Sequence, residues 1–187
     1  MATSEIRITG FGGQGVILCG YIIGKAASLY NEQHGTLTQS FGPEARGSAC
    51  SAQVVVSDDR VLYPYVTIPK YMLAMSQDGY NIHKDKITDD CVICYEKDLV
   101  KPAKHGSNAR LFGIPATRFA EDLGRKIVLN IVMLGFFGAV TGILPKDALR
   151  QAVENSVPGG TEELNLKAFD RGYEYGLQLI NKEEAVA

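Results

Sequence analysis

The chain opens with an alternating pattern that gives way to a glycine-rich turn and a long apolar segment. Residues 6–9 alternate apolar and polar side chains, which is typical of a half-buried strand. Gly10, Gly12 and Gly15 follow in the G-x-G-x-x-G spacing, and mostly apolar residues continue to Tyr30. This pattern predicts a strand, a tight turn and a helix whose first N–H groups face outward. Such a turn can hold a phosphate, a carboxylate or a partner's backbone, although glycines that only pack the helix on a sheet would give the same pattern.

The later pattern predicts an α/β fold. A strand is expected at residues 36–40, parallel to the first strand and next to it because a helix connects the two. Residues 52–56 and 61–64 flank a polar segment and predict an antiparallel hairpin. Further strands are expected at residues 71–76, 91–96 and 110–114, and further helices at residues 118–123, 146–157 and from 162 onward. We therefore expect one domain over residues 1–187, a three-layer α/β/α sandwich with a mixed, mainly parallel sheet.

Residues 127–144 are uncharged and apolar enough to raise the question of a membrane span. The segment has only the minimum length for a span and contains Asn130 and three glycines, so we predict a buried helix and no membrane. Gly135, Gly138 and Gly142 would let another backbone approach closely, which suggests a subunit interface.

Charge and cysteine usage narrow the functional classes. The 187 residues carry a net charge of −2, and no basic run interleaved with aromatics is present, so nucleic acid is not an expected partner. Cys19, Cys50, Cys91 and Cys94 lie in apolar or small-residue runs, which predicts a reducing, cytoplasmic location. The last two have C-x-x-C spacing but would point to opposite faces of a strand, so we expect core cysteines and no metal site.

No acid, base or nucleophile stands out, which leaves two loops as the candidate site. The glycine turn lacks both the P-loop lysine and the acid that a dinucleotide site needs about 20 residues later. The turn and the loop 42–48 are expected together at the carboxyl ends of parallel strands, where α/β sheets bind ligands. Arg46 could bind a phosphate or carboxylate with Glu44 orienting it, or the two could pair only with each other.

The one basic cluster follows the predicted strand 91–96. A solvated loop is the favoured interpretation of this cluster, ahead of contact with a phosphate or an acidic partner. Its members are Lys97, Lys101, Lys104, His105 and Arg110.

Four segments together resemble the gamma subunit of 2-oxoacid:ferredoxin oxidoreductases, over residues 6–176. They are GFGGQGVILCGYIIGKAA, SFGPEARG, VLNIVMLGFFGAVTGIL and NLKAFDRGYEYG. The resemblance implies a fold similar to the gamma domain of pyruvate:ferredoxin oxidoreductase. It also implies a complex that decarboxylates a 2-oxoacid on thiamine diphosphate with Mg, passes electrons through iron–sulfur clusters to ferredoxin, and forms an acyl-coenzyme A. The form of the second loop is most similar to the 2-oxoglutarate or branched-chain members.

The resemblance also implies a division of labour among subunits. The cofactors would be carried by partner subunits of alpha, beta and delta type, so the isolated chain, alone or as a homodimer, should be inactive. No residue of this chain would be catalytic, and Ser48 departs from the glycine often found at its position. The role of Asn130 stays open. The residues implied near the coenzyme A site are Gly12, Gly13, Gln14, Gly15, Glu44 and Arg46. Two rival hypotheses are a nucleotide-dependent oxidoreductase that uses the turn, and an assembly subunit without a ligand.

Overall fold

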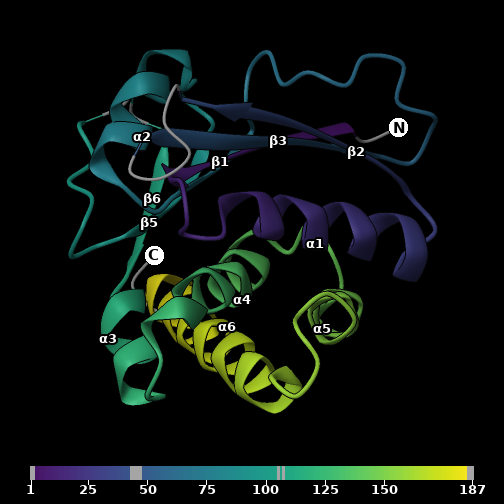
Figure 1. The fold of residues 1–187 in the computed structure, drawn as a ribbon. Helices are drawn as coiled ribbons and strands as arrows, with labels where there is room; N and C mark the ends of the chain where they lie inside the picture. The colour runs from purple at the N-terminus through teal and green to yellow at the C-terminus, as the bar shows by residue number, and fades with distance from the viewer. Residues whose placement is uncertain (1–2, 43–47, 105, 107, 185–187) are drawn as a thin grey trace.

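A computed structural model describes residues 3–42, 48–104, 106 and 108–184, and its core is one mixed sheet (Figure 1). The described strands are ordered β2-β3-β1-β4-β5-β6. β1 pairs with β3 in antiparallel and with β4 in parallel fashion, and β5 and β6 continue the parallel side. Of these strands only β3 runs against the others, as predicted for a mainly parallel sheet. Their bounds are β1 Thr3–Phe11, β2 His34–Phe41, β3 Ala49–Ser57, β4 Tyr71–Ala74, β5 Val92–Glu96 and β6 Arg110–Ile114.

Helices cover the two faces of the sheet unequally. On one face α1 lies under β1, β2 and β3, while α4 lies under β4 to β6 and α6 packs behind it (Figure 1). The other face is covered by the short helix α2, a 3-10 turn at Lys84–Lys86 and the segment 58–70. The predicted α/β/α layering is therefore present, and the layer that contains α2 is the thinner of the two helical layers. The helices are α1 Val16–Tyr30, α2 Gln77–His83, α3 Ala116–Asp122, α4 Leu129–Thr141, α5 Lys146–Glu154 and α6 Glu162–Glu184, with a 3-10 turn at Lys126–Val128 before α4.

The alternation in β1 decides which face each side chain meets. Ile6 and Ile8 are fully buried in the core shared with α1 and α4. Arg7, on the other face, is also buried, and its Nη2 donates a hydrogen bond to the Val66 carbonyl at 2.9 Å. Glu5 accepts hydrogen bonds from two backbone N–H groups of the same segment, at 2.7 and 2.9 Å. Polar side chains of the sheet therefore hold segment 58–70 over its thin face.

Two predictions about the antiparallel part of the sheet are wrong. β3 pairs with β2 on one side and with β1 on the other, so no edge is left for residues 61–64, which form no strand. β2 does run parallel to β1, but β3 lies between them, so the two are not neighbours. The short polar connection after β3 favoured a hairpin, but both edges of β3 are already paired, with β1 and with β2.

The apolar segment forms the buried helix α4, and a second backbone approaches one of its glycines, Gly135. That backbone belongs to α6 of the same chain and not to another subunit. A Cβ on Gly135 would overlap the carbonyl of Phe169, and a Cβ on Gly172 would overlap that of Val132. Gly142 instead ends α4 in a left-handed conformation, with φ 57°. No described helix combines the length and apolar character that crossing a bilayer requires.

Candidate functional site

The glycine turn links the end of β1 to the start of α1 and leaves the head of that helix open. Gly13 and Gly15 have φ angles of 96° and 76°, which favour glycine. Gly15 precedes α1 without a side-chain cap, and the first turn holds no acidic residue. Cys19 N donates the first intrahelical bond, to Gly15 O at 3.0 Å. The first-turn N–H groups, together with the helix dipole, therefore form a site that suits an anion.

Gln14 holds this turn in place. Its Oε1 accepts a hydrogen bond from Phe11 N at 2.7 Å, and its Nε2 donates to the Met75 carbonyl at 3.2 Å. The side chain thus ties the turn to the ends of β1 and β4. The resemblance places Gln14 near the coenzyme A site, and that placement stays a prediction; in the structure its side chain bonds to the protein backbone.

The second predicted loop meets the first. Gly12 N donates to Ser48 O, and Gly42 N donates to Ala49 O, both at 3.0 Å. The two loops are therefore adjacent, although their strands are separated by β3. Glu44 and Arg46 lie outside the described residues.

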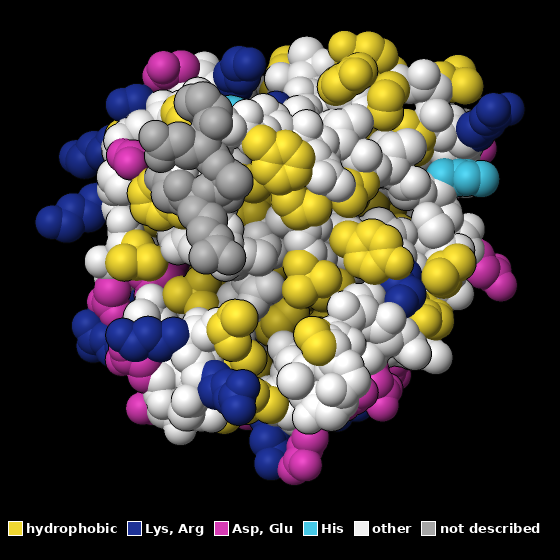
Figure 2. All heavy atoms as spheres, in the orientation of Figure 1, with side chains coloured by type: hydrophobic (Ala, Val, Ile, Leu, Met, Phe, Trp, Pro, Cys, Tyr) yellow, Lys and Arg dark blue, Asp and Glu magenta, His cyan; other side chains and the backbone are white. Residues whose placement is uncertain are grey.

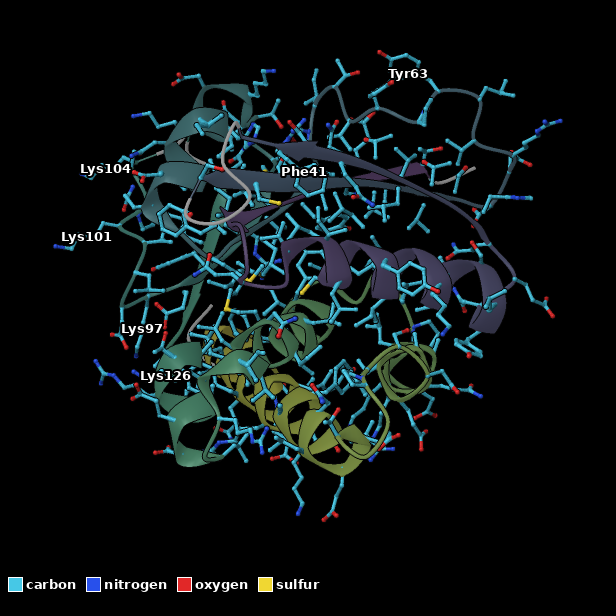
Figure 3. The ribbon with its side chains drawn as sticks, viewed as in Figure 1. Phe41, Tyr63, Lys97, Lys101, Lys104 and Lys126 are labelled. Carbon is cyan, nitrogen blue, oxygen red and sulfur yellow. The ribbon has the colours of Figure 1, made fainter. Side chains whose placement is uncertain are left out.

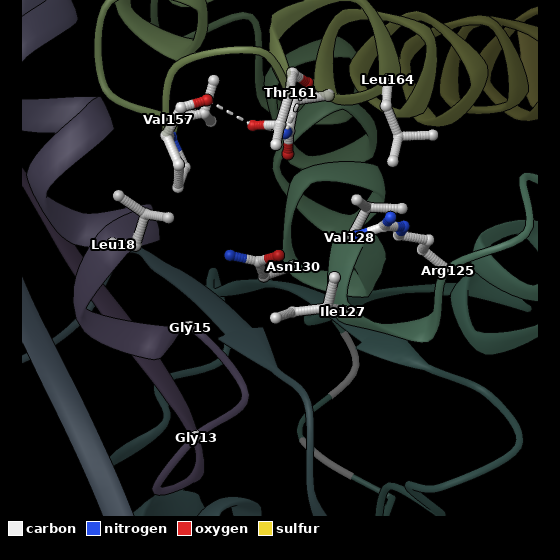
Figure 4. A pocket seen from close by; sticks show the side chains of 12 residues that line it. Gly13, Gly15, Leu18, Arg125, Ile127, Val128, Asn130, Val157, Thr161 and Leu164 are labelled. Atoms are coloured by element: carbon white, nitrogen blue, oxygen red, sulfur yellow. Dashed lines mark hydrogen bonds between the residues drawn. The ribbon is translucent and has the colours of Figure 1, made fainter.

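A pocket of about 380 Å³ opens beside the glycine turn (Figure 4). Gly13 and Gly15 lie on one side, and the residues just before α4 and α6 lie on the others. On the face of Figure 2, apolar side chains gather between α1 and the helices below it. The apolar lining residues are Leu18, Ile127, Val128, Val157, Pro158 and Leu164, and the polar ones are Arg125, Asn130, Thr161 and Asn165.

Asn130 is the polar group at the back of this pocket. Only 4% of its surface is exposed, and the residue lines the pocket. The amide lies against Gly15, where a Cβ would overlap it, and its nitrogen points toward α1 (Figure 4). Its backbone oxygen accepts a bond from Cys19 Sγ at 3.4 Å. The sequence showed a lone polar residue in an apolar helix, but only the packing of α4 against α1 reveals where its amide points.

The electrostatics of the pocket favour a bound anion. The first turns of α1, α4 and α6 all border it, and each contributes about half a positive charge. Glu162 and Glu163 offset this at α6, whereas the first turns of α1 and α4 contain no acid. Arg125 is the single ionisable residue in the described lining. The arrangement can bind and orient a ligand but offers no acid, base or nucleophile.

The other candidate groups do not assemble into a reactive site among the described residues. Cys91 and Cys94 face opposite sides of the sheet, in separate clusters, as predicted. Burial raises the pKa of the Cys19 and Cys91 thiols to about 12, so both are protonated. The described part of the chain contains no group of three side chains placed to hold a metal.

The basic cluster lies on the surface loop after β5. Lys97, Lys101 and Lys104 are exposed and project from one edge of the molecule, as Figure 3 shows. His105 is outside the described residues. Arg110 stacks its guanidinium on Phe112, 4.9 Å from the ring centroid. The described lysines do not line the pocket beside the turn.

A smaller cleft of about 300 Å³ lies on the thin face of the sheet. It is lined by Thr9 and by His83 at the end of α2. Burial, together with the charges of Arg7 and Lys86, lowers the pKa of His83 to about 4. The imidazole is therefore neutral at pH 7. Sequence analysis missed α2, which begins where the Ser76 hydroxyl accepts a hydrogen bond from Gly79 N at 3.1 Å.

Comparisons with known proteins agree over nearly the whole chain. The family model described as pyruvate ferredoxin/flavodoxin oxidoreductase matches residues 5–175. The chain is 45% identical to 2-oxoglutarate synthase subunit KorC of Methanocaldococcus jannaschii, over 94% of this chain and 95% of that protein. It is 33% identical to pyruvate synthase subunit PorC of Methanothermobacter thermautotrophicus, over 91% and 94%. A solved keto/oxoacid ferredoxin oxidoreductase gamma subunit from Geobacter sulfurreducens superposes with a TM-score of 0.82 at 38% identity, covering 94% of this chain and 99% of that one.

Proposed function

Since this chain belongs to the pyruvate ferredoxin/flavodoxin oxidoreductase family as a gamma-type subunit, we propose that its complex oxidises 2-oxoglutarate and reduces ferredoxin. The observation that carries this proposal is the identity of 44–45% to three 2-oxoglutarate synthase subunits, against 33% to a pyruvate synthase subunit. This difference in identity agrees with the form of the second loop, which is similar to 2-oxoglutarate or branched-chain members. The experiment below tests the branched-chain alternative with 2-oxoisovalerate as a comparison substrate.

The reaction itself would take place on partner subunits. Among the described residues, the lining of the pocket beside the glycine turn offers no acid, base or nucleophile, and its one ionisable residue is Arg125. Thiamine diphosphate with Mg, and the iron–sulfur clusters, therefore belong in this proposal to subunits of alpha, beta and delta type. The four cysteines are free and buried, which supports a reducing compartment, the cytoplasm. We treat residues 1–187 as a single domain of that complex.

The contribution of this chain would be to bind coenzyme A. The uncapped N-terminus of α1 suits a phosphate, and Gly13 and Gly15 line the pocket beside it. The amide of Asn130 and the apolar pocket lie next to that N-terminus, so a phosphate ester with an apolar body fits the residues present. The resemblance adds Glu44 and Arg46, which lie outside the described residues, to the proposed contact.

Purification of the complex through this chain tests the assignment. We expect partner subunits to co-purify, and the assembly to reduce ferredoxin when 2-oxoglutarate and coenzyme A are both supplied. Pyruvate and 2-oxoisovalerate serve as comparison substrates. Preferential oxidation of either one would refute the substrate assignment, and catalysis by the isolated chain would refute the division of labour.

A variant at Arg46 separates a coenzyme A contact from a purely structural subunit. In the assembled complex, Arg46→Ala should raise the KM for coenzyme A by roughly tenfold, the usual effect of losing one charged hydrogen bond, and leave kcat unchanged. Arg60→Ala is the matched control, because Arg60 follows β3 at the opposite end of the sheet. If both variants bind coenzyme A like the wild type, Arg46 is not a contact.

A nicotinamide or flavin titration tests the remaining rival, a nucleotide-dependent oxidoreductase, and we expect no binding.

A further inference from the structure

We propose that the open edge of β2 pairs with β2 of a second copy of this chain, in antiparallel fashion and centred on Thr38, so that the two sheets continue into each other. Each copy places Phe41 in a groove between α1 and β2 of the other. The contact does not depend on the proposed function. It also lies on a different part of the fold from the pocket beside the glycine turn.

The outer edge of β2 lacks the features that normally keep a strand from pairing further. β2 stands first in the sheet order, and among the described residues only β3 pairs with it. Natural edge strands are usually short or carry lysine or proline, because an open row of backbone N–H and C=O groups recruits another strand. β2 has eight residues and contains no proline, lysine, arginine or acid. β6, at the other edge, has five residues and begins with Arg110.

A groove beside this edge can receive an aromatic ring. It has a volume of about 260 Å³, with Tyr21 and Leu29 of α1 on one side and Gly35 and Leu37 of β2 on the other. Phe41, in the last position of the same strand, is 64% exposed. By the alternation of the strand, Phe41 belongs to the same face of the sheet as Gly35 and Leu37. Each copy therefore carries both an exposed ring and a groove that accepts one.

Antiparallel pairing centred on Thr38 brings the ring and the groove together. Phe41 then lies opposite Gly35 of the second copy, because the two are equally far from Thr38 along the strand. An aromatic residue opposite a glycine compensates for the missing side chain. On the other face of the sheet Thr38 lies opposite its own copy and Thr36 opposite Ser40, and hydroxyl pairs of this kind stabilise antiparallel strands. The two-fold axis repeats every contact, so the surface is self-complementary.

The position of α1 is compatible with this pairing. α1 packs on both β2 and β3 and therefore lies over that pair of strands. Neighbouring strands are about 4.8 Å apart, so the two copies of α1 would lie about 10 Å apart, close to the usual distance between packed helices. Lys25 is the one charged residue in the described lining of the groove, and its Nζ donates to the Asn155 carbonyl at 2.6 Å. The helices can therefore approach without setting two free lysines against each other.

Analytical ultracentrifugation of the full-length chain measures the dimer. We expect the wild type to dimerise, and Phe41→Glu should raise the dissociation constant at least roughly a hundredfold, because each dimer buries two of these rings. Tyr63→Glu is the matched control and should leave the dimer intact. Tyr63 is 63% exposed and stands apart from Phe41, on the segment 58–70 (Figure 3). A monomeric wild type, or a dimer that Phe41→Glu leaves intact, would overturn the proposal.

Cysteine cross-linking tests the register. Residues directly opposite each other in antiparallel strands have Cα atoms about 4.5–5.5 Å apart, within reach of a disulfide, so Thr38→Cys should link two copies on oxidation. Ser40→Cys should not, because its two copies would lie about 14 Å apart. The four native cysteines are buried and should not interfere. Equal cross-linking of the two variants, or none with Thr38→Cys, would overturn the proposed pairing.

The assembled complex distinguishes a second copy from another occupant of the edge. We expect Thr38→Cys to link two copies of this chain there as well. If the isolated chain is monomeric and Phe41→Glu instead prevents a partner subunit from co-purifying, the edge receives a strand of that partner and the proposal is wrong. Mass and cross-linking are the measurements, so the outcome does not depend on which 2-oxoacid the complex oxidises.

Discussion

Two identical substitutions, Gly135→Ala in α4 and Gly24→Ala in α1, should change stability in opposite directions. Alanine is favoured over glycine in a helix by about 1 kcal/mol, so propensity alone would stabilise both variants. An added Cβ at Gly24 meets nothing within 4 Å. At Gly135 the Cβ would overlap the carbonyl oxygen of Phe169 and lie 2.9 Å from its carbonyl carbon. Because the obstacle is backbone, α4 and α6 must move apart.

The magnitudes follow from those contacts. Overpacking typically destabilises a protein by about 1–3 kcal/mol, and we take the upper end because no side chain can rotate away. Subtracting the gain in helix propensity leaves a net loss of about 2 kcal/mol for Gly135→Ala, against a gain of about 1 kcal/mol for Gly24→Ala. For a chain of this size the melting temperature should fall by roughly 4–8 °C in the first variant and rise by roughly 2–4 °C in the second.

Thermal and denaturant unfolding of the full-length chain measure both effects. The same variants should be assembled with the partner subunits, because the sequence suggested that the glycines of α4 lie at a subunit interface. Gly135→Ala should weaken the isolated chain itself. If it is as stable as the wild type when isolated but fails to assemble, the glycine faces another subunit and the packing argument is wrong.

Three further perturbations test particular contacts of the structure. Gly15→Ala should lower stability by about 1–3 kcal/mol in denaturant unfolding, because its φ of 76° strains alanine and the Cβ would displace Asn130; wild-type stability would contradict this. Glu96 is fully buried and its carboxylate accepts three backbone N–H bonds, so Glu96→Ala should cost about 3 kcal/mol in the same assay, and a loss below about 1 kcal/mol would refute that role. The lowered pKa of His83 means that the unfolded chain binds more protons between pH 6.5 and about 4. Stability should therefore fall as pH falls through that window, and His83→Gln should flatten this part of a urea-unfolding profile; an equally steep profile would argue against it.

Local signals predicted the first half of the candidate site. The alternation of β1, the glycine spacing and the apolar run of α1 lie within 25 residues, and each is a short-range pattern. Positive φ at Gly13 and Gly15 is what the turn required. Gly12 does adjoin the second loop, through Ser48. The strand, the turn and the helix that follows it could therefore be predicted from the sequence.

The pairing of strands and the packing of helices that lie far apart in the sequence could not be predicted in the same way. The polar segment 57–60 indicated a hairpin turn, yet β3 is buried between β2 and β1, and that choice depends on the whole sheet. The glycines of α4 indicated a close backbone, but the sequence did not say that Phe169 of α6 provides it at Gly135. The short helix α2 was missed because seven residues that include Gly79 carry too little periodicity. Asn130 was visible as a polar interruption, and its place at the head of α1 required the packed structure.

Hydrogen–deuterium exchange in the assembled complex, with and without coenzyme A, tests the central claim most directly. The claim is that the glycine turn and the pocket beside it form a ligand-docking surface while reactive groups come from partner subunits. Bound coenzyme A should slow exchange in residues 12–18 and 125–130, and Arg60 with its neighbours should exchange at an unchanged rate. Protection that appears only in the partner subunits, with both segments of this chain exchanging as before, would contradict the account.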